Sequence, residues 1–182
     1  RQADGSIFIQ NGETVVLVNV CYDKLNERDV DFFPLTVEYR EKSAASGKFP
    51  GGFIKRENRP SNDEILRGRI VDRTIRPMFP EGFKSEVQVI INVLSYDLVT
   101  PHDVLAVNAS SIALSMSSIP FLQPVSAVSI GLFDSSEEFV INPDEKMLEN
   151  AKLSLFVSGT RDRVLMIEAG ANEVSEEVFL KA

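Results

Sequence analysis

The sequence predicts an α+β fold in which strands pair as hairpins and in mixed sheets, with two main helices inserted between them. Short apolar runs with two-residue alternation recur along the chain, as expected of half-buried strands. Asn11-Gly12 separates two such runs, 5–10 and 13–20, and this dipeptide is a strong hairpin signal. Only the segments 61–76 and 103–118 have the length and apolar spacing of full helices. This order is not a regular βαβαβ alternation.

The other elements follow from local signals. Ser61 and Glu64 have the spacing of a helix capping box, and Pro77 ends that helix at Arg76. Glycines and prolines interrupt 41–60, so we expect a long loop, which is often functional at this length. The remaining expectations are a loop at 22–31, strands at 32–40 and 86–98, hairpins at 124–141 and 153–169, a helical turn at 143–151 and a last helix from Ser175.

Composition limits the class of protein. The chain has 182 residues and a formal net charge of −8, which suits one large globular domain or two small ones. No apolar run approaches the roughly 20 residues of a membrane-spanning helix, so we expect no membrane partner. The single Cys21 cannot form an internal disulfide, which favours a reducing, cytoplasmic location. The chain starts without methionine and ends within a predicted helix, so we expect a fragment of a longer protein.

One stretch, residues 47–77, contrasts with this acidic chain. It holds eight of the 19 basic residues and only four of the 27 acids. On a helical wheel Arg69, Arg73 and Arg76 fall on one stripe, where like charges repel. An external anion relieves that repulsion. The alternative is internal pairing, for example of Arg76 with Asp72 four residues earlier.

The residues of the loop before this helix also indicate a binding site for an anion. Phe53, Lys55 and Arg56 follow a flexible Gly51-Gly52 pair, and Arg59 follows them. An aromatic ring beside cations suits single-stranded nucleic acid, since the ring stacks on a base and the cations bind phosphates. Arginine matches phosphate bidentately. The alternative for Phe53 is an ordinary core anchor for the loop.

Known catalytic patterns are missing from the sequence. There is no Cys/His metal spacing, P-loop, dinucleotide-binding glycine motif or nucleophile elbow. We expect the lone His102, at the start of a helix, to be a surface or N-terminal-turn residue, and the serines of 103–118 to serve helix packing. The residues alone therefore predict an RNA- or anion-binding surface without a catalytic centre.

Four segments of the sequence are specific enough to compare with a known family. The most specific is residues 32–83, FFPLTVEYREKSAASGKFPGGFIKRENRPSNDEILRGRIVDRTIRPMFPEGF, and the others are RQADGSIFIQNGETVVLVNV, SSIPFLQPVSAVSIGL and KLSLFVSG. In sequence and in order these segments resemble bacterial polynucleotide phosphorylases over nearly the whole chain. The resemblance implies the first of two RNase PH-like core domains, with a ribosomal-protein-S5-like βαβ fold. It implies that 1–170 is this core domain, truncated at its N-terminus, and that 171–182 begins a helical linker domain.

The resemblance also implies a function for the longer protein. That function is 3′-to-5′ phosphorolysis of RNA to nucleoside diphosphates by a homotrimeric ring, with inorganic phosphate as co-substrate, Mg²⁺ as cofactor and possible partners in an RNA-degradation complex. In this family the first core domain carries an F-F-R-R-type loop motif at a constriction of the central channel. The motif stands here as Phe53-Ile54-Lys55-Arg56, so its second aromatic and first arginine are replaced. The implied RNA contacts are Phe53, Lys55, Arg56, Arg59, Arg69, Arg73 and Arg76.

The chemistry of the family's catalytic copy has no counterpart here. A serine-rich phosphate-binding turn is replaced by SYDLVTPHD. A D-x-D-x-K strand that binds metal corresponds to Lys152-Leu153-Ser154-Leu155-Phe156, and a histidine corresponds to Arg67. We therefore expect a non-catalytic core domain that guides single-stranded RNA and builds the trimer, with no catalytic or metal-binding residues of its own. The alternatives are a phosphorolytic or other phosphate-transferring domain, and a purely structural ring scaffold.

Overall fold

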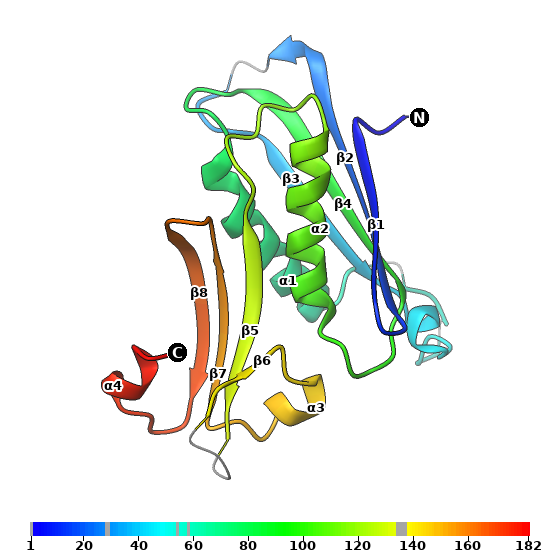
Figure 1. The fold of residues 1–182 in the computed structure, drawn as a ribbon. Helices are drawn as coiled ribbons and strands as arrows, with labels where there is room; N and C mark the ends of the chain where they lie inside the picture. The colour runs from blue at the N-terminus through cyan, green and yellow to red at the C-terminus, as the bar shows by residue number, and fades with distance from the viewer. Residues whose placement is uncertain (1, 28–29, 54, 58, 134–137) are drawn as a thin grey trace.

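Two four-stranded sheets lie on either side of two helices (Figure 1). The computed structural model describes residues 2–27, 30–53, 55–57, 59–133 and 138–182. The first sheet has the order β1-β2-β4-β3 and the second the order β6-β5-β7-β8. The strands are β1 Gly5–Asn11, β2 Thr14–Glu27, β3 Leu35–Glu41, β4 Ser85–Ser95, β5 Ser126–Leu132, β6 Val140–Ile141, β7 Leu153–Gly159 and β8 Val164–Ala171. The helices are α1 Asn62–Ile75, α2 His102–Met116, α3 Glu145–Leu148 and α4 Glu176–Phe179. The predicted α+β class, with mixed pairing and two main helices, is confirmed.

The first sheet combines antiparallel and parallel pairing. β1 and β2 form the predicted hairpin around Gly12, whose φ is 59°. β4 is antiparallel to β2 but parallel to β3, with Val37 opposite Val89. Parallel neighbours need a crossover connection. Here that connection contains α1 and the long loop before it, residues 41–60, which we call the basic loop. Both therefore lie beside β3.

The main core lies between the sheets. Alternate residues of β2 and β4 point inward, as the two-residue period of strands requires. They contact α2, whose other side packs on β5 (Figure 1). The buried inward residues of the two strands are Val16, Val18, Val20, Val87, Val89, Ile91 and Val93. The second sheet has a smaller apolar cluster of its own, formed by four buried residues of β5 and β7: Ile130, Leu132, Leu153 and Leu155.

The strand expected at 32–40 is β3, which begins at Leu35, and two further strand boundaries differ from the sequence prediction because of specific contacts. β2 continues to Glu27 through part of the expected loop 22–31, because β4 still pairs with it, first Val87 with Tyr22 and then Ser85 with Glu27 after an irregularity. Pairing with a neighbour overrides the low strand propensity of charged residues. β4 ends at Ser95 instead of 98, because Asp97 accepts hydrogen bonds from the main-chain N–H groups of the following turn.

Helix α1 has the predicted N-terminus. Ser61 Oγ accepts from Glu64 N at 3.2 Å, and Glu64 Oε2 accepts from Ser61 N at 2.6 Å, so the capping box is complete. The α-helix ends at Ile75, and Pro77 lies in a short 3₁₀ turn, Arg76–Met78. Within the described ranges no helix has both the length and the apolar character needed to cross a membrane.

Candidate nucleic-acid interface

The tip of the basic loop presents its aromatic and cationic side chains to solvent. Phe53 is fully exposed, so it is not the core anchor that the sequence left open. Lys55, Arg56 and Arg59 are also exposed. In the part of the chain that the structure describes, none of these three cations has an ion-pair partner. Ile54 of the implied loop motif lies outside the described residues.

One buried carboxylate closes the base of this loop. Glu64 is only 7% exposed. Its Oε1 accepts from Glu41 N at 2.8 Å, at the start of the loop, and its Oε2 accepts from Ser61 N at 2.6 Å, at the end. The capping residue of α1 therefore also joins the two ends of the loop.

A second carboxylate closes the loop nearer its tip. Glu57 Oε1 accepts from Ser43 N and from Ser43 Oγ, both at 2.8 Å. Lys42 Nζ donates to the Glu57 carbonyl at 3.1 Å. The Ser43 main-chain and hydroxyl donors, with the nearby charge of Lys42, hold the pKa of the Glu57 carboxyl below its ordinary value.

The three arginines of the helical stripe differ in their surroundings. Arg69 is exposed and has no ion-pair partner among the described residues. Arg73 lies 2.8 Å from Glu168 of β8, and both side chains are 52% exposed. An ion pair as exposed as this contributes little, so Arg73 remains open to exchange with another anion.

Arg76 is held internally. Its Nε and Nη2 donate to Asp72 at 2.7 and 2.6 Å, as one of the sequence alternatives expects. Its Nη1 donates to the Phe33 carbonyl at 2.9 Å, and Nη2 also donates to the Leu35 carbonyl at 3.3 Å. Arg76 therefore fastens the end of α1 to the start of β3.

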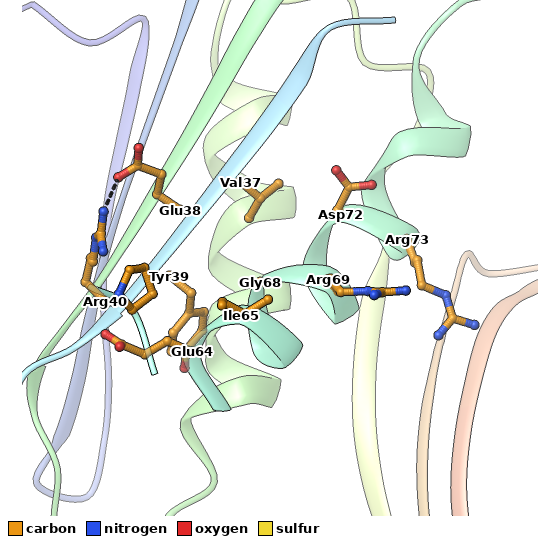
Figure 2. Close-up of a pocket in the computed structure, with 11 residues that line it drawn as sticks. Val37, Glu38, Tyr39, Arg40, Glu64, Ile65, Gly68, Arg69, Asp72 and Arg73 are labelled. Atoms are coloured by element: carbon orange, nitrogen blue, oxygen red, sulfur yellow. Dashed lines mark hydrogen bonds and ion pairs between the residues drawn. The ribbon is translucent and has the colours of Figure 1, made fainter. Parts of the chain in front are cut away.

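A groove of about 460 Å³ runs between β3 and α1. It begins at Pro60, the residue after Arg59, and extends along α1 to Arg73. Figure 2 shows Arg69 and Arg73 pointing from α1 toward the same side, away from β3. Arg69 and Arg73 line this groove, and Pro60 is the residue at which it adjoins the basic loop.

Beneath this surface lies a polar network that the sequence did not reveal. His102 lies in the first turn of α2, as one of the two expectations has it, but it is only 1% exposed and is therefore not a surface residue. Its Nδ1 hydrogen-bonds the Tyr39 hydroxyl, and its Nε2 lies 3.1 Å from Arg67 Nη1 and 3.2 Å from Glu41 Oε2. Arg67 also pairs with Glu41 and, at 2.8 Å, with Glu145 of α3. The network joins β3, α1, α2 and α3, and a polar partner set of this kind cannot be deduced from one isolated histidine.

Ionisation in this network follows from its contacts. The hydrogen bond with His102 lowers the pKa of Glu41 from its ordinary value, and the positive charge of Arg67 acts in the same direction. Burial raises the pKa of Tyr39 well above its ordinary value. Glu41 therefore remains an anion that ties the start of the basic loop to α1.

The structure places the residues that the sequence resemblance aligns with a metal-binding strand. Ser154 lies on β7, and Phe156 is buried in the main core. Across the ranges that the structure describes, no group of three or more His, Cys, Asp or Glu residues is placed to hold a metal ion. Two serines of α2 are buried: Ser110 Oγ donates to the Ala106 carbonyl and Ser111 Oγ accepts from Val125 N, whereas Ser115 is exposed.

Sequence reasoning overlooked Phe49 as a candidate contact. Its side chain is 91% exposed, on the same loop as Phe53. Lys48 precedes it and is also exposed. The available signal was the Lys-Phe pair before Pro50-Gly51-Gly52, which repeats the aromatic-plus-cation combination of the loop tip.

Family models match nearly the whole chain in two parts. Residues 1–120 match the model described as 3′ exoribonuclease family, domain 1, and residues 123–182 match domain 2 of that family. Two solved structures share the fold at 18% sequence identity. Rice (Oryza sativa) Rrp46 aligns over 99% of this chain and 80% of its own with a TM-score of 0.76. The Archaeoglobus fulgidus exosome with RNA bound to the active site aligns over 100% and 78%, with a TM-score of 0.70.

Curated relatives are much more similar in sequence. A polyribonucleotide nucleotidyltransferase of Alkaliphilus oremlandii is 51% identical over 99% of this chain. Proteins of the same name from Finegoldia magna and Rhodospirillum centenum are 50% and 48% identical over 100% of it. The chain spans about a quarter of the length of these relatives: 25%, 25% and 26%.

Proposed function

Because the chain belongs to the 3′ exoribonuclease family, we propose that it is the RNA-guiding, non-catalytic core domain of a polyribonucleotide nucleotidyltransferase. The observation that carries this proposal is the surface formed by the exposed loop tip and the adjoining groove. It combines Phe53, Lys55, Arg56 and Arg59 with Arg69 and Arg73. We add Phe49 to these contacts.

The surface suits a flexible polyanion better than a small ligand. The tip cations have no internal ion pairs in the described chain, so phosphates meet them without first displacing an acid. Arg59 and Arg69 are ten residues apart, and the helix between them rises about 1.5 Å per residue, so the cations are spread along a strand of several nucleotides. Exposed phenylalanine supplies a stacking face that tolerates any base.

Arg76 has a different part in the proposal. Its four internal hydrogen bonds favour the structural reading for this residue. We therefore place the RNA contacts on the loop, Arg69 and Arg73, with Arg76 holding α1 in position against β3.

The wider activity belongs to the longer protein. In our proposal a homotrimer in the cytoplasm degrades RNA, mRNA included, from the 3′ end with inorganic phosphate, and Mg²⁺ acts in another domain. The core domain 1–170, with 171–182 opening a helical linker, supplies ring contacts and the RNA path. RNA-degradation partners would then bind the assembled ring.

The test is fluorescence-anisotropy binding of a labelled oligo-A across a salt series. Each phosphate contact on a single strand contributes about −0.7 to the slope of log K against log salt. The Arg56→Ala/Arg59→Ala variant should bind more weakly and flatten the slope by about 1.4. Its matched control is Arg161→Ala/Arg163→Ala, which removes two exposed arginines from the β7–β8 turn.

The outcomes separate guidance from scaffolding. The proposal is supported if the loop variant binds oligo-A more weakly and has a flatter slope of log K against log salt, while the control variant behaves as the wild type. Equal slopes in both variants contradict it and favour a structural scaffold. Sedimentation of the same samples shows whether binding requires a trimer.

A further inference from the structure

An acid stands within the cationic loop tip. Glu57 follows Arg56 directly and precedes Arg59 by two residues. A carboxylate beside phosphate-binding arginines repels RNA. On charge alone, removing Glu57 should therefore strengthen RNA binding.

The contacts of Glu57 argue against a purely electrostatic effect. Its carboxylate accepts two hydrogen bonds from Ser43, at the opposite side of the loop, and its carbonyl accepts one from Lys42. Neither Arg56 nor Arg59 pairs with it in the described part of the chain. The Glu57 carboxylate is thus hydrogen-bonded to Ser43, while neither neighbouring arginine has an ion pair among the described residues.

The partner of Glu57 is itself fixed to the fold. Ser43 begins the 3₁₀ turn Ser43–Ser46, and Tyr96 N donates to the Ala45 carbonyl in that turn at 2.9 Å. The first stem of the loop is therefore attached to the chain just after β4. Through Ser43, Glu57 attaches the second stem to the same place.

We propose that Glu57 is a positioning residue that closes the basic loop onto Ser43 and so presents Arg56 and Arg59 to RNA phosphates. This inference rests on the proposed RNA-guiding function. A loop already ordered in its binding geometry loses less conformational freedom when RNA binds. Glu57 then aids binding of an anion although it is itself an anion.

Three variants of this chain separate position from charge. Glu57→Ala removes both the hydrogen bonds and the charge, and should weaken oligo-A binding about threefold to tenfold. Glu57→Gln keeps an Oε1 acceptor for Ser43 and removes only the charge, so its affinity should equal or exceed that of the wild type. Asp63→Asn removes an exposed acid of the first turn of α1 and serves as the charge control, with equal or tighter binding.

A second measurement reports on the loop without RNA. Trypsin cuts after Lys55 and Arg56 only when the loop fits its active site, so the native-state cleavage rate measures loop order. Trypsin cuts more slowly before an acidic residue such as Glu57, so each native-state rate is divided by the cleavage rate of the same variant when unfolded. This ratio should rise several-fold in Glu57→Ala and should equal that of the wild type in Glu57→Gln and Asp63→Asn.

The two measurements give distinguishable failures. If Glu57→Ala binds RNA as tightly as Glu57→Gln, or if its cleavage is not accelerated, the positioning role is overturned. If the wild type itself shows no salt-dependent RNA binding, the proposed function fails, and the cleavage rates still decide whether Glu57 closes the loop. Weaker binding and faster cleavage confined to Glu57→Ala support the inference.

Discussion

Glu41 illustrates how one residue can serve both the core and the surface. Its main-chain N–H donates to Glu64, and its carboxylate contacts Arg67 and His102. The first contact closes the basic loop, and the others fasten β3 to α1 and α2. A change at Glu41 therefore affects folding stability and loop geometry together.

The lowered pKa of Glu41 predicts a pH dependence of stability. A carboxyl whose pKa is lower in the folded state contributes stability above its unfolded pKa, about 4.3, and loses it as the pH falls through the folded pKa. Glu41→Gln should therefore unfold at lower denaturant concentration than the wild type at pH 7. This difference should shrink as the pH is lowered toward 3.

Chemical denaturation between pH 3 and 8 measures this difference. Glu38→Gln is the matched control, because Glu38 lies on the same strand in an exposed pair with Arg40, and such pairs contribute little. A constant gap between Glu41→Gln and the wild type at every pH would show that the ionised form of Glu41 does not carry the effect.

At the level of elements, the stability of α1 depends more on its capping box than on the intrinsic helix propensity of its residues. The helix contains Gly68, Thr74 and four β-branched apolar residues, which are not strong helix formers. Ser61 and Glu64 satisfy main-chain N–H groups that otherwise lack partners. The same cap aligns the helix cations with the loop.

We therefore expect Ser61→Ala to cost about 1 kcal/mol of unfolding free energy, within the range of about 0.5 to 2 for lost caps. For a chain of this size that lowers the melting temperature by roughly 2 to 4 °C. Ser115→Ala, at an exposed position within α2, is the control and should not destabilise. Calorimetry of the two variants decides, and equal melting temperatures would contradict the role of the cap.

For the whole molecule, the chain has the fold of the 3′ exoribonuclease family. At the strand position where the sequence resemblance implies acids and a lysine in a catalytic copy, this chain holds Ser154 and the buried Phe156. Catalysis, in our proposal, depends on a part of the longer protein.

The chain alone should therefore release no nucleoside diphosphate. We expect no ADP above the blank when it is incubated with oligo-A, inorganic phosphate and Mg²⁺. A full-length polyribonucleotide nucleotidyltransferase is the positive control. ADP release by this chain would instead support the alternative that the domain has phosphorolytic activity of its own.

The sequence predicts this fold well where signals are local. The capping box at Ser61, the Asn11-Gly12 hairpin and the α2 segment follow from neighbouring residues and are confirmed. The extension of β2 and the burial of His102 depend on partners far along the chain, β4 and Glu41, which one sequence does not specify. For the candidate site, the loop cations were found from composition. The internal bonding of Arg76 and the role of Glu57 required coordinates.

The closure of the basic loop by Glu64 has a consequence for evolution and engineering. Because one buried carboxylate holds both ends of the loop, the enclosed segment can change in length without moving β3 or α1. Doubling the length of a flexible loop costs only about 0.6 kcal/mol. New sequences can therefore be grafted between Glu41 and Ser61 to alter what the surface binds, while the scaffold is preserved. A lineage of such proteins has the same freedom to vary its ligand preference at this one place.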